Sequence, residues 1–287
     1  MAETSLTEQN PEENSPEEIS PEELERRDRE QQWLDPENTS ENMLRLVRRM
    51  GLSRRKYRLF INACCRSVWS SMIDERCRET VEVADRYIEG ISTDKEAYGA
   101  LHGVNNANQE ALSATEDNIM NSSLQISLTY LAARSILWIN NGDYEDDLSW
   151  AGAMATVGDL TSVKQYLAKR FRGSHRSEAD TLEMRSQGNL LRDIFGDTSK
   201  YNPFSKEKIV IDPTWLTANG GAVPRLAETI YNERSFKDMV VLWDALEEAG
   251  CTNEEIRKHC QGDGQHVRGC WVIDLILQKG EARQNEK

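Results

Sequence analysis

The chain has 287 residues, of which 38% are hydrophobic, and it contains seven tryptophans. This length is sufficient for a sizeable hydrophobic core, in one large domain or two small ones. Since no apolar run reaches 18 residues and the N-terminus is acidic and rich in proline, we expect no transmembrane helix, signal peptide or membrane partner. The six cysteines include an adjacent pair and others at helical spacing. This pattern does not suit a disulfide framework and favours a reducing, cytoplasmic setting.

The net charge of −14 is unevenly distributed along the chain. Residues 1–42 carry fourteen Asp and Glu against three Arg, whereas residues 43–66 carry eight basic residues and no acid. The first segment repeats a Pro-Glu-Glu unit up to Pro21 and has almost no large apolar residue before Trp33. We predict a disordered acidic tail over 1–32, with a helix from Pro21 as an alternative. The tail could serve solubility or cover the basic segment that follows.

Apolar residues at helical spacing, bounded by capping residues and glycines, recur through the rest of the chain. They predict helices at about 40–50, 54–72, 74–88, 93–101, 121–139, 148–171, 182–195, 224–232, 236–249, 252–260 and 267–279. Residues 208–211 are the one stretch that resembles a short extended segment. Because the helices follow no fixed repeat period, we predict an all-α fold, an irregular multi-helix bundle.

We divide the predicted bundle into an N-terminal helical region, 33–172, and a C-terminal helical region, 173–287. Both the segment 58–72 and the closing block carry apolar faces rich in cysteine and tryptophan. We therefore expect the closing block to pack on the 58–72 helix, so that the two regions share one core.

Basic residues gather around the turn between the first two predicted helices. They are Arg45, Arg48, Arg49, Arg54, Arg55, Lys56 and Arg58. Such a cluster could bind nucleic acid. The chain as a whole is acidic and shows no nucleic-acid reading motif, however, and the acidic tail could neutralise the cluster. We therefore favour an intramolecular contact or a protein partner over nucleic acid.

The closing block, residues 251–279, contains two of the four histidines and three of the six cysteines. Its candidate metal ligands are His259, Cys260, His266 and Cys270, to which Cys251 or the distant Cys64 and Cys65 could be added. Their spacing lacks the paired C-x2-C or H-x3-5-H units of zinc fingers. Cysteines on apolar helix faces usually pack as small hydrophobic residues, so we favour packing and keep zinc as the alternative.

Asp274 lies inside the most apolar helical run of the chain. A buried carboxylate requires a partner, for which His266, Arg268 or a distant arginine could serve. A structural tether is the favoured interpretation. The alternative is a ligand site formed by His266, Arg268 and Asp274, since the Gly-x-Gly turn at 262–264 and the following helix start could hold an anion.

Several long strings resemble a known family. They are WLDPENTSENMLRLVRRMGLSRRKYRLFINACCRSVW, DERCRETVEVADRYIEG, LLRDIFGD, RLAETIYNERSFKDMVVLWDALEEAGC and EEIRKHCQGDGQHVRGCWVIDLILQK. Over about 33–90 and 190–279 the chain is similar to a family of uncharacterised helical proteins abundant in planctomycete bacteria. The resemblance implies a helical fold and these boundaries, and it implies no activity, ligand or catalytic residue.

Three functions are consistent with these patterns. The first is a non-enzymatic helical scaffold that binds another protein, favoured by the few histidines and the lack of a recognisable catalytic motif. The second is a metal- or anion-dependent enzyme or sensor that uses the His, Cys and Asp residues of 259–274. The third is a nucleic-acid binder through 45–58. We expect no cofactor, with zinc as the alternative, and the oligomeric state stays open.

Overall fold

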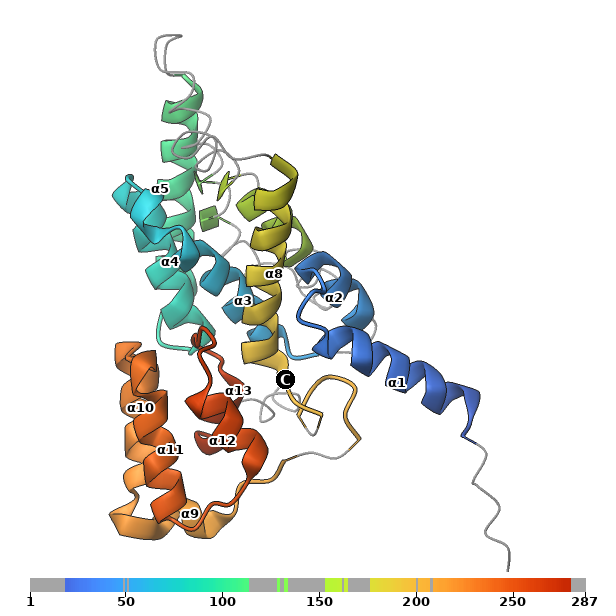
Figure 1. Ribbon diagram of the computed structural model, residues 1–287. Coiled ribbons are helices and arrows are strands. Elements are labelled where there is room, and N and C mark those ends of the chain that lie inside the picture. The colour runs from blue at the N-terminus through green and yellow to red at the C-terminus, as the bar shows by residue number, and fades with distance from the viewer. Residues whose placement is uncertain are drawn as a thin grey trace, which may run out of the picture.

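A computed structural model describes most of the chain (Figure 1). The described residues are 19–48, 50, 52–113, 128–129, 132–133, 153–161, 163–164, 176–199, 201–206 and 209–279. Every regular element within them is a helix, which confirms the predicted all-α, irregular bundle. The predicted helices at 121–139 and 148–171 fall largely outside these residues. Within the described ranges, none of the helices has the length and apolar character needed to span a bilayer.

In the described N-terminal part, six α-helices have defined bounds, and residues 153–161 and 163–164 are helical as well. The six are α1 (Pro21–Leu34), α2 (Ser40–Val47), α3 (Arg54–Ser67), α4 (Glu75–Ile88), α5 (Asp94–Leu112) and α8 (Arg176–Phe195). Side-chain caps begin several of them, and Thr93 forms a capping box with Glu96 at the start of α5. Helix α5 continues well past the predicted end at Leu101, because Val104 and Ala107 are buried on its inner face.

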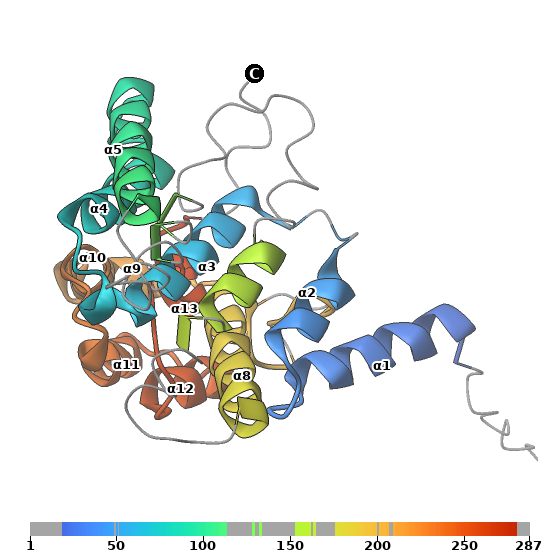
Figure 2. The ribbon, with the colours of Figure 1, turned by 90° about the horizontal axis from the view of Figure 1, so that it is seen from above.

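Part of the expected disordered tail is helical. Helix α1 begins at Pro21 with Ser20 as its N-cap, as in the alternative that the sequence left open. Figures 1 and 2 show α1 extending away from the body of the molecule. Its last turn is anchored by Trp33, which is fully buried and donates from Nε1 to the carbonyl of Gly196 at 2.8 Å. Residues 1–18 lie outside the described residues.

The C-terminal part consists of shorter helices that follow one another closely. They are α9 (Pro213–Thr217), α10 (Ala222–Glu233), α11 (Met239–Glu248), α12 (Glu254–Gln261) and α13 (Trp271–Ile276). The last helix starts at Trp271 rather than at the predicted position 267. Residues 262–270 therefore form a loop that leads from α12 to α13, and this loop carries His266.

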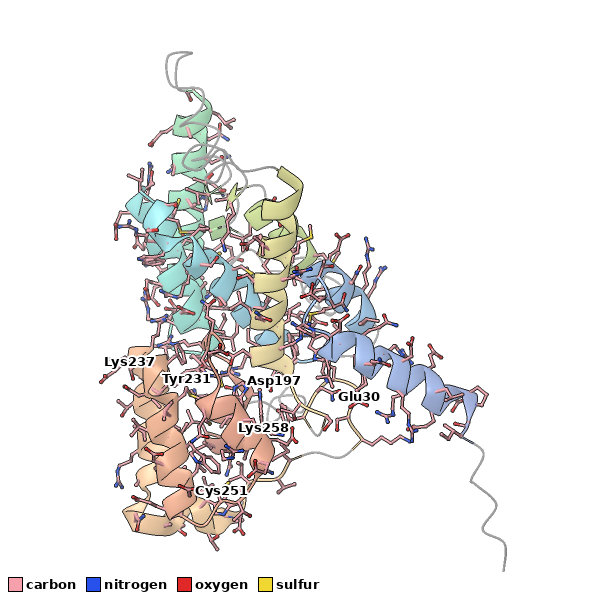
Figure 3. The ribbon with its side chains drawn as sticks, viewed as in Figure 1. Glu30, Asp197, Tyr231, Lys237, Cys251 and Lys258 are labelled. Carbon is pink, nitrogen blue, oxygen red and sulfur yellow. The ribbon has the colours of Figure 1, made fainter. Side chains whose placement is uncertain are left out.

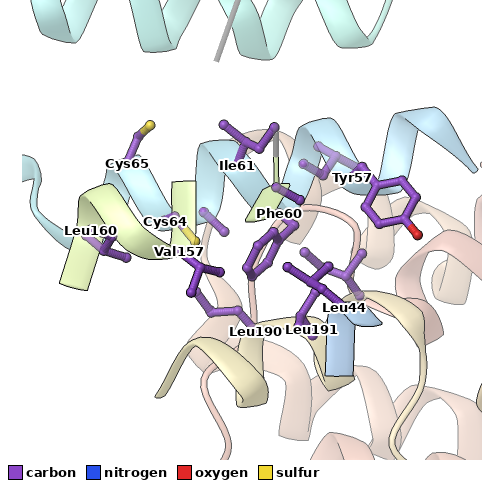
Figure 4. Close-up of a cluster of buried hydrophobic side chains, with 14 of the residues drawn as sticks. Leu44, Tyr57, Phe60, Ile61, Cys64, Cys65, Val157, Leu160, Leu190 and Leu191 are labelled. Carbon is purple, nitrogen blue, oxygen red and sulfur yellow. The ribbon is translucent and has the colours of Figure 1, made fainter. Parts of the chain in front are cut away.

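The described residues contain two large hydrophobic cores, and the expectation that the two regions share one core stays a prediction. The first surrounds α3, where Phe60 packs among side chains of α2 and α8 such as Leu44 and Leu191 (Figure 4). The second lies within residues 209–276 and centres on Trp271 and Leu242. Helix α8 follows the predicted division at 173, and it buries Leu190, Leu191, Ile194 and Phe195 in the first core.

The two cores nevertheless touch, and their contact fixes the loop before α13. Gly269 has a φ of +93°, and a Cβ placed there would lie 2.8 Å from Cδ1 of Leu59 on α3 and 3.6 Å from Cγ1 of Ile194 on α8. Only glycine fits this close approach at this backbone angle. The loop of the closing block thus approaches α3 and α8 closely at Gly269.

Candidate metal centre

Four side chains from four segments converge between α8, α12 and α13. Asp193 comes from the last turn of α8, His259 from α12, His266 from the loop, and Cys270 is the N-cap residue of α13. One potential ligand atom from each lies within 4.8 Å of all the others. Asp193, His259 and Cys270 are buried, and His266 is half-buried. Such a set of nitrogen, oxygen and sulfur donors is typical of a zinc site.

The separations between these donor atoms are close to those of a tetrahedral metal site. Zinc bonds of about 2.0–2.1 Å to nitrogen or oxygen and about 2.3 Å to sulfur put neighbouring ligand atoms about 3.3–3.6 Å apart. His259 Nε2 lies 3.1 Å from Cys270 Sγ and 3.3 Å from Asp193 Oδ1. His266 Nδ1 lies 3.9 Å from the same Sγ and 2.7 Å from the same Oδ1. Small shifts of these side chains would accommodate an ion.

Outer hydrogen bonds orient the ligands. His259 Nδ1 contacts Asp197 Oδ2 at 2.8 Å, and Asp197 also accepts from Trp271 Nε1 at 2.9 Å. An Nδ1–H that donates to Asp197 leaves the Nε2 lone pair of His259 free on the side of Cys270 and Asp193. The second oxygen of Asp193 accepts from the backbone N–H of Val267 at 2.9 Å. Figure 3 labels Asp197 and Lys258, where the end of α8 meets α12. Such carboxylate–histidine pairs commonly support metal ligands.

Burial and mutual contacts shift the pKa values of the group. Burial would raise the pKa of Asp193, but hydrogen bonds with His259 and His266 hold it below the ordinary value. Burial would lower the pKa of His259, but Cys270, Asp193 and Asp197 raise it well above the ordinary value. The pKa of His266 is raised to about 9, since hydrogen bonds with Asp193 and Cys270 outweigh burial. Contacts among the four groups therefore favour the protonated form of both imidazoles.

Cys270, His259 and Asp197 are also arranged like a nucleophile, base and acid of a catalytic triad. The Cys270 Sγ lies 3.1 Å from His259 Nε2, and His259 Nδ1 lies 2.8 Å from Asp197 Oδ2. Catalysis would require a substrate carbonyl to reach the sulfur. Cys270 is 0% exposed and His259 is 6% exposed. Because the thiol is enclosed, we favour metal binding over covalent catalysis.

The sequence identified three of the four residues in the group. Cys260 does not belong to it: its side chain packs in the second core, as does Cys251, while Cys64 and Cys65 are in the first core. Asp193 takes the fourth place and was not predicted. Its only signal in the sequence is an acid within the apolar stretch Leu190–Phe195, the same kind of anomaly that drew attention to Asp274.

The predicted ligand set of His266, Arg268 and Asp274 does not form one site. Asp274 pairs with Arg55, and Arg268 donates to the carbonyls of Tyr231 and Asn232 at the end of α10, both at 3.0 Å. His266 instead lies beside Asp193, His259 and Cys270. Asp274 is thus a structural tether held by a distant arginine, the favoured interpretation of the sequence.

The basic segment is largely engaged in internal contacts. Arg55 binds Asp274, Lys56 donates to the carbonyl of Ile194 at 2.7 Å, and Arg45 pairs with Glu41 within α2. Arg48, Arg54 and Arg58 also take part in interactions, and Arg49 lies outside the described residues. These contacts engage several of the basic residues within the protein, and the preference for an intramolecular contact or a protein partner over nucleic acid stays a prediction.

Comparison with protein-family models, curated proteins and solved structures finds no match to this chain. The resemblance to the planctomycete family therefore stays a prediction. The function has to be inferred from the geometry of the site.

Proposed function

We propose that this protein binds one zinc ion through Asp193, His259, His266 and Cys270, and that the ion has a structural role. The convergence of four donor atoms within 4.8 Å, from segments distant in the sequence, is the observation that carries the proposal. The outer hydrogen bonds of Asp197 and of the Val267 N–H support it further.

The chemistry of the donor set favours zinc. One thiolate, one carboxylate and two neutral imidazoles would carry a total charge of −2, which a divalent cation neutralises inside a buried site. A mixture of sulfur, nitrogen and oxygen ligands suits zinc, whereas Mg²⁺ and Ca²⁺ prefer oxygen alone.

Four protein ligands leave no coordination position for water or substrate. Zinc sites that are closed in this way stabilise folds, whereas catalytic sites keep one position open. A closed site of this kind favours a non-enzymatic protein over a metal-dependent hydrolase. The ion would join the end of α8, which belongs to the first core, to α12, α13 and the loop of the second. A role as a protein-interaction scaffold is compatible with this arrangement and stays a prediction.

The test is elemental analysis of the purified, untagged full chain, followed by substitution with Co²⁺ and thermal melting with and without a chelator. We expect about one zinc per chain, tetrahedral cobalt absorption with a thiolate band, and a lower melting temperature with chelator. Cys270→Ser should abolish the thiolate band. Cys260→Ser removes a neighbouring buried thiol outside the group and should retain it. No zinc uptake by the wild type, or equal uptake by the Cys270→Ser variant, would refute the proposal.

A further inference from the structure

A second polar site lies beside the loop that carries His266, at the junction of the two cores. It is a pocket of about 90 Å³ between α3, α4, the end of α10 and the loop. Its polar lining includes Asn62, Arg66, Asp85, Arg234, Gln265 and Arg268, together with Ser67, whose hydroxyl donates to the carbonyl of Cys64. This space is large enough for several water molecules or one small ion.

The lining is cationic. It contains three guanidinium groups and a single carboxylate, Asp85, which is 2% exposed. Arg66 donates from Nε to Asp85 at 3.0 Å, and Arg234 also pairs with Asp85. Glu82, outside the lining, accepts from Arg66 at 2.9 Å. Even with Glu82 included, the three arginines exceed the acids by one positive charge.

Arg268 supplies this excess charge. Its hydrogen bonds go to main-chain carbonyls of Tyr231 and Asn232, and within the described part of the chain it forms no ion pair. Its guanidinium also lies over the Tyr231 ring, 5.2 Å from the centroid. Arginine binds oxyanions through paired N–H groups, so a cation held in this way beside a pocket is suited to an anionic ligand.

Two further features indicate a ligand. Asn62 is 2% exposed and donates from Nδ2 to Asp85 at 2.9 Å, while its Oδ1 is buried without a hydrogen-bond partner. Buried acceptors are normally satisfied, so Oδ1 lacks a donor that a ligand in the adjoining pocket could supply. Arg234 ends α10 with a φ of +54°, a conformation that glycine usually adopts at this position. An arginine held there brings its charge to the pocket despite backbone strain.

We propose that this pocket binds a phosphate group that carries a hydroxyl. The anionic oxygens would accept from Arg268, Arg234 and Gln265, and the hydroxyl would donate to Oδ1 of Asn62. An ionised carboxylate or sulfate has acceptors only and would leave Oδ1 unpaired. Inorganic phosphate near neutral pH and a singly protonated phosphate monoester both meet the requirement. The site shares no residue with the proposed zinc ligands and does not depend on that proposal.

The test is calorimetric titration of the full chain, as purified and after zinc loading, at constant ionic strength. The probes are inorganic phosphate, phosphoserine and sulfate. We expect phosphate to bind at least about tenfold more tightly than sulfate, as the loss of one buried hydrogen bond implies. Comparison of inorganic phosphate with phosphoserine then distinguishes a free ion from a monoester. No binding of either phosphate, or equal binding of sulfate, would overturn the proposal.

Two pairs of variants locate the binding. Gln265→Glu places a negative charge at an exposed position of the lining and should weaken phosphate binding about tenfold without disturbing the fold. Gln261→Glu makes the same change at an exposed position outside the lining and should have no effect. Arg268→Gln should weaken binding about tenfold or more, against Arg257→Gln as the control. Unchanged affinity in both Gln265→Glu and Arg268→Gln would exclude this pocket.

Discussion

Arg55 on α3 donates from Nη1 to Oδ2 of Asp274 on α13 at 2.7 Å and from Nη2 to Oδ1 at 3.3 Å. The same guanidinium contacts Glu89 at 3.1 Å and the hydroxyl of Tyr231 at 2.7 Å, and Lys279 donates to Glu89 at 2.6 Å. Figure 3 labels Tyr231 where the C-terminal helices meet the N-terminal part. Two cations and two carboxylates thus balance each other between the two cores.

Removal of Arg55 should strongly destabilise the protein. Arg55→Met leaves Asp274 buried without its cation, and the loss of one member of a buried pair costs about 3–5 kcal/mol. The free energy of unfolding, measured by urea denaturation at pH 7, should fall by that amount. Arg45→Met breaks an exposed pair with Glu41 and should change it by less than about 1 kcal/mol. Similar losses in the two variants would contradict a tether between the cores.

The defect of Arg55→Met should shrink in acid. Burial raises the pKa of Asp274 above its ordinary value, although Arg55 and Lys56 counteract this. Without Arg55 the folded protein binds the Asp274 proton more tightly than the unfolded chain does. As the pH falls towards that raised pKa, Asp274 takes up a proton and the Arg55→Met variant regains stability relative to wild type. Above that pKa, the variant loses this stability again. Urea denaturation between pH 5 and pH 7 should show that the difference in unfolding free energy between wild type and Arg55→Met becomes smaller as the pH falls. A constant difference would contradict the titration of Asp274 as its cause.

Zinc affinity should rise with pH. The pKa of His266 is raised to about 9 in the metal-free group, so a proton must leave His266 before it can bind zinc. Below that pH, each proton displaced lowers the affinity by up to about tenfold per pH unit. Competition with a chromophoric chelator between pH 6 and pH 9 measures the slope. A flat profile would show that His266 is not a ligand.

Asp197 should act on zinc through His259 rather than by direct binding. Asp197→Asn keeps the four ligands and loses a charged hydrogen bond, so the zinc affinity should fall about 10–100-fold. The cobalt spectrum should stay tetrahedral with its thiolate band. Asp193→Asn removes a ligand and should change the cobalt coordination as well as the affinity. If both variants gave the same zinc affinity and the same cobalt spectrum, Asp193 and Asp197 would not differ in their roles as ligand and supporting residue.

Gly269 should tolerate no side chain. Gly269→Ala combines a positive φ with a contact of 2.8 Å to Leu59, and these should together destabilise the fold by about 2–4 kcal/mol. Gly264→Ala lies in the same loop with nothing within 4 Å of its Cβ and should have little effect. Thermal melting of both variants measures the difference in stability between them. A Gly269→Ala protein as stable as Gly264→Ala would contradict the close approach of the loop to α3.

Local features of the fold could be predicted from the sequence because their causes are local. The capping box at Thr93 and the start of α2 after Thr39 are examples. Apolar periodicity shows that a helix face is buried but does not say against which partner. For this reason the sequence did not show that the buried apolar residues of the closing block cluster with those of α10 and α11.

The same distinction applies to the site. His259, His266 and Cys270 stand near one another in the chain, so their residue types alone drew attention to them. Asp193 joins them only through the packing of α8, which no short-range spacing reveals. Cys260 is adjacent to His259, but it faces the second core and not the other ligands.

The order of the ligands along the chain has a consequence for biosynthesis. Asp193 precedes Cys270 by 77 residues, so at about 5–20 residues per second a ribosome needs roughly 4–15 s to make the segment between them. Helix α8 and the first core can form within that interval. During that interval Asp193 would lack its two histidine partners. Its carboxylate would stay hydrated until α12 and the loop have been synthesised and have folded. Capture of the proposed ion would therefore follow the formation of the first core.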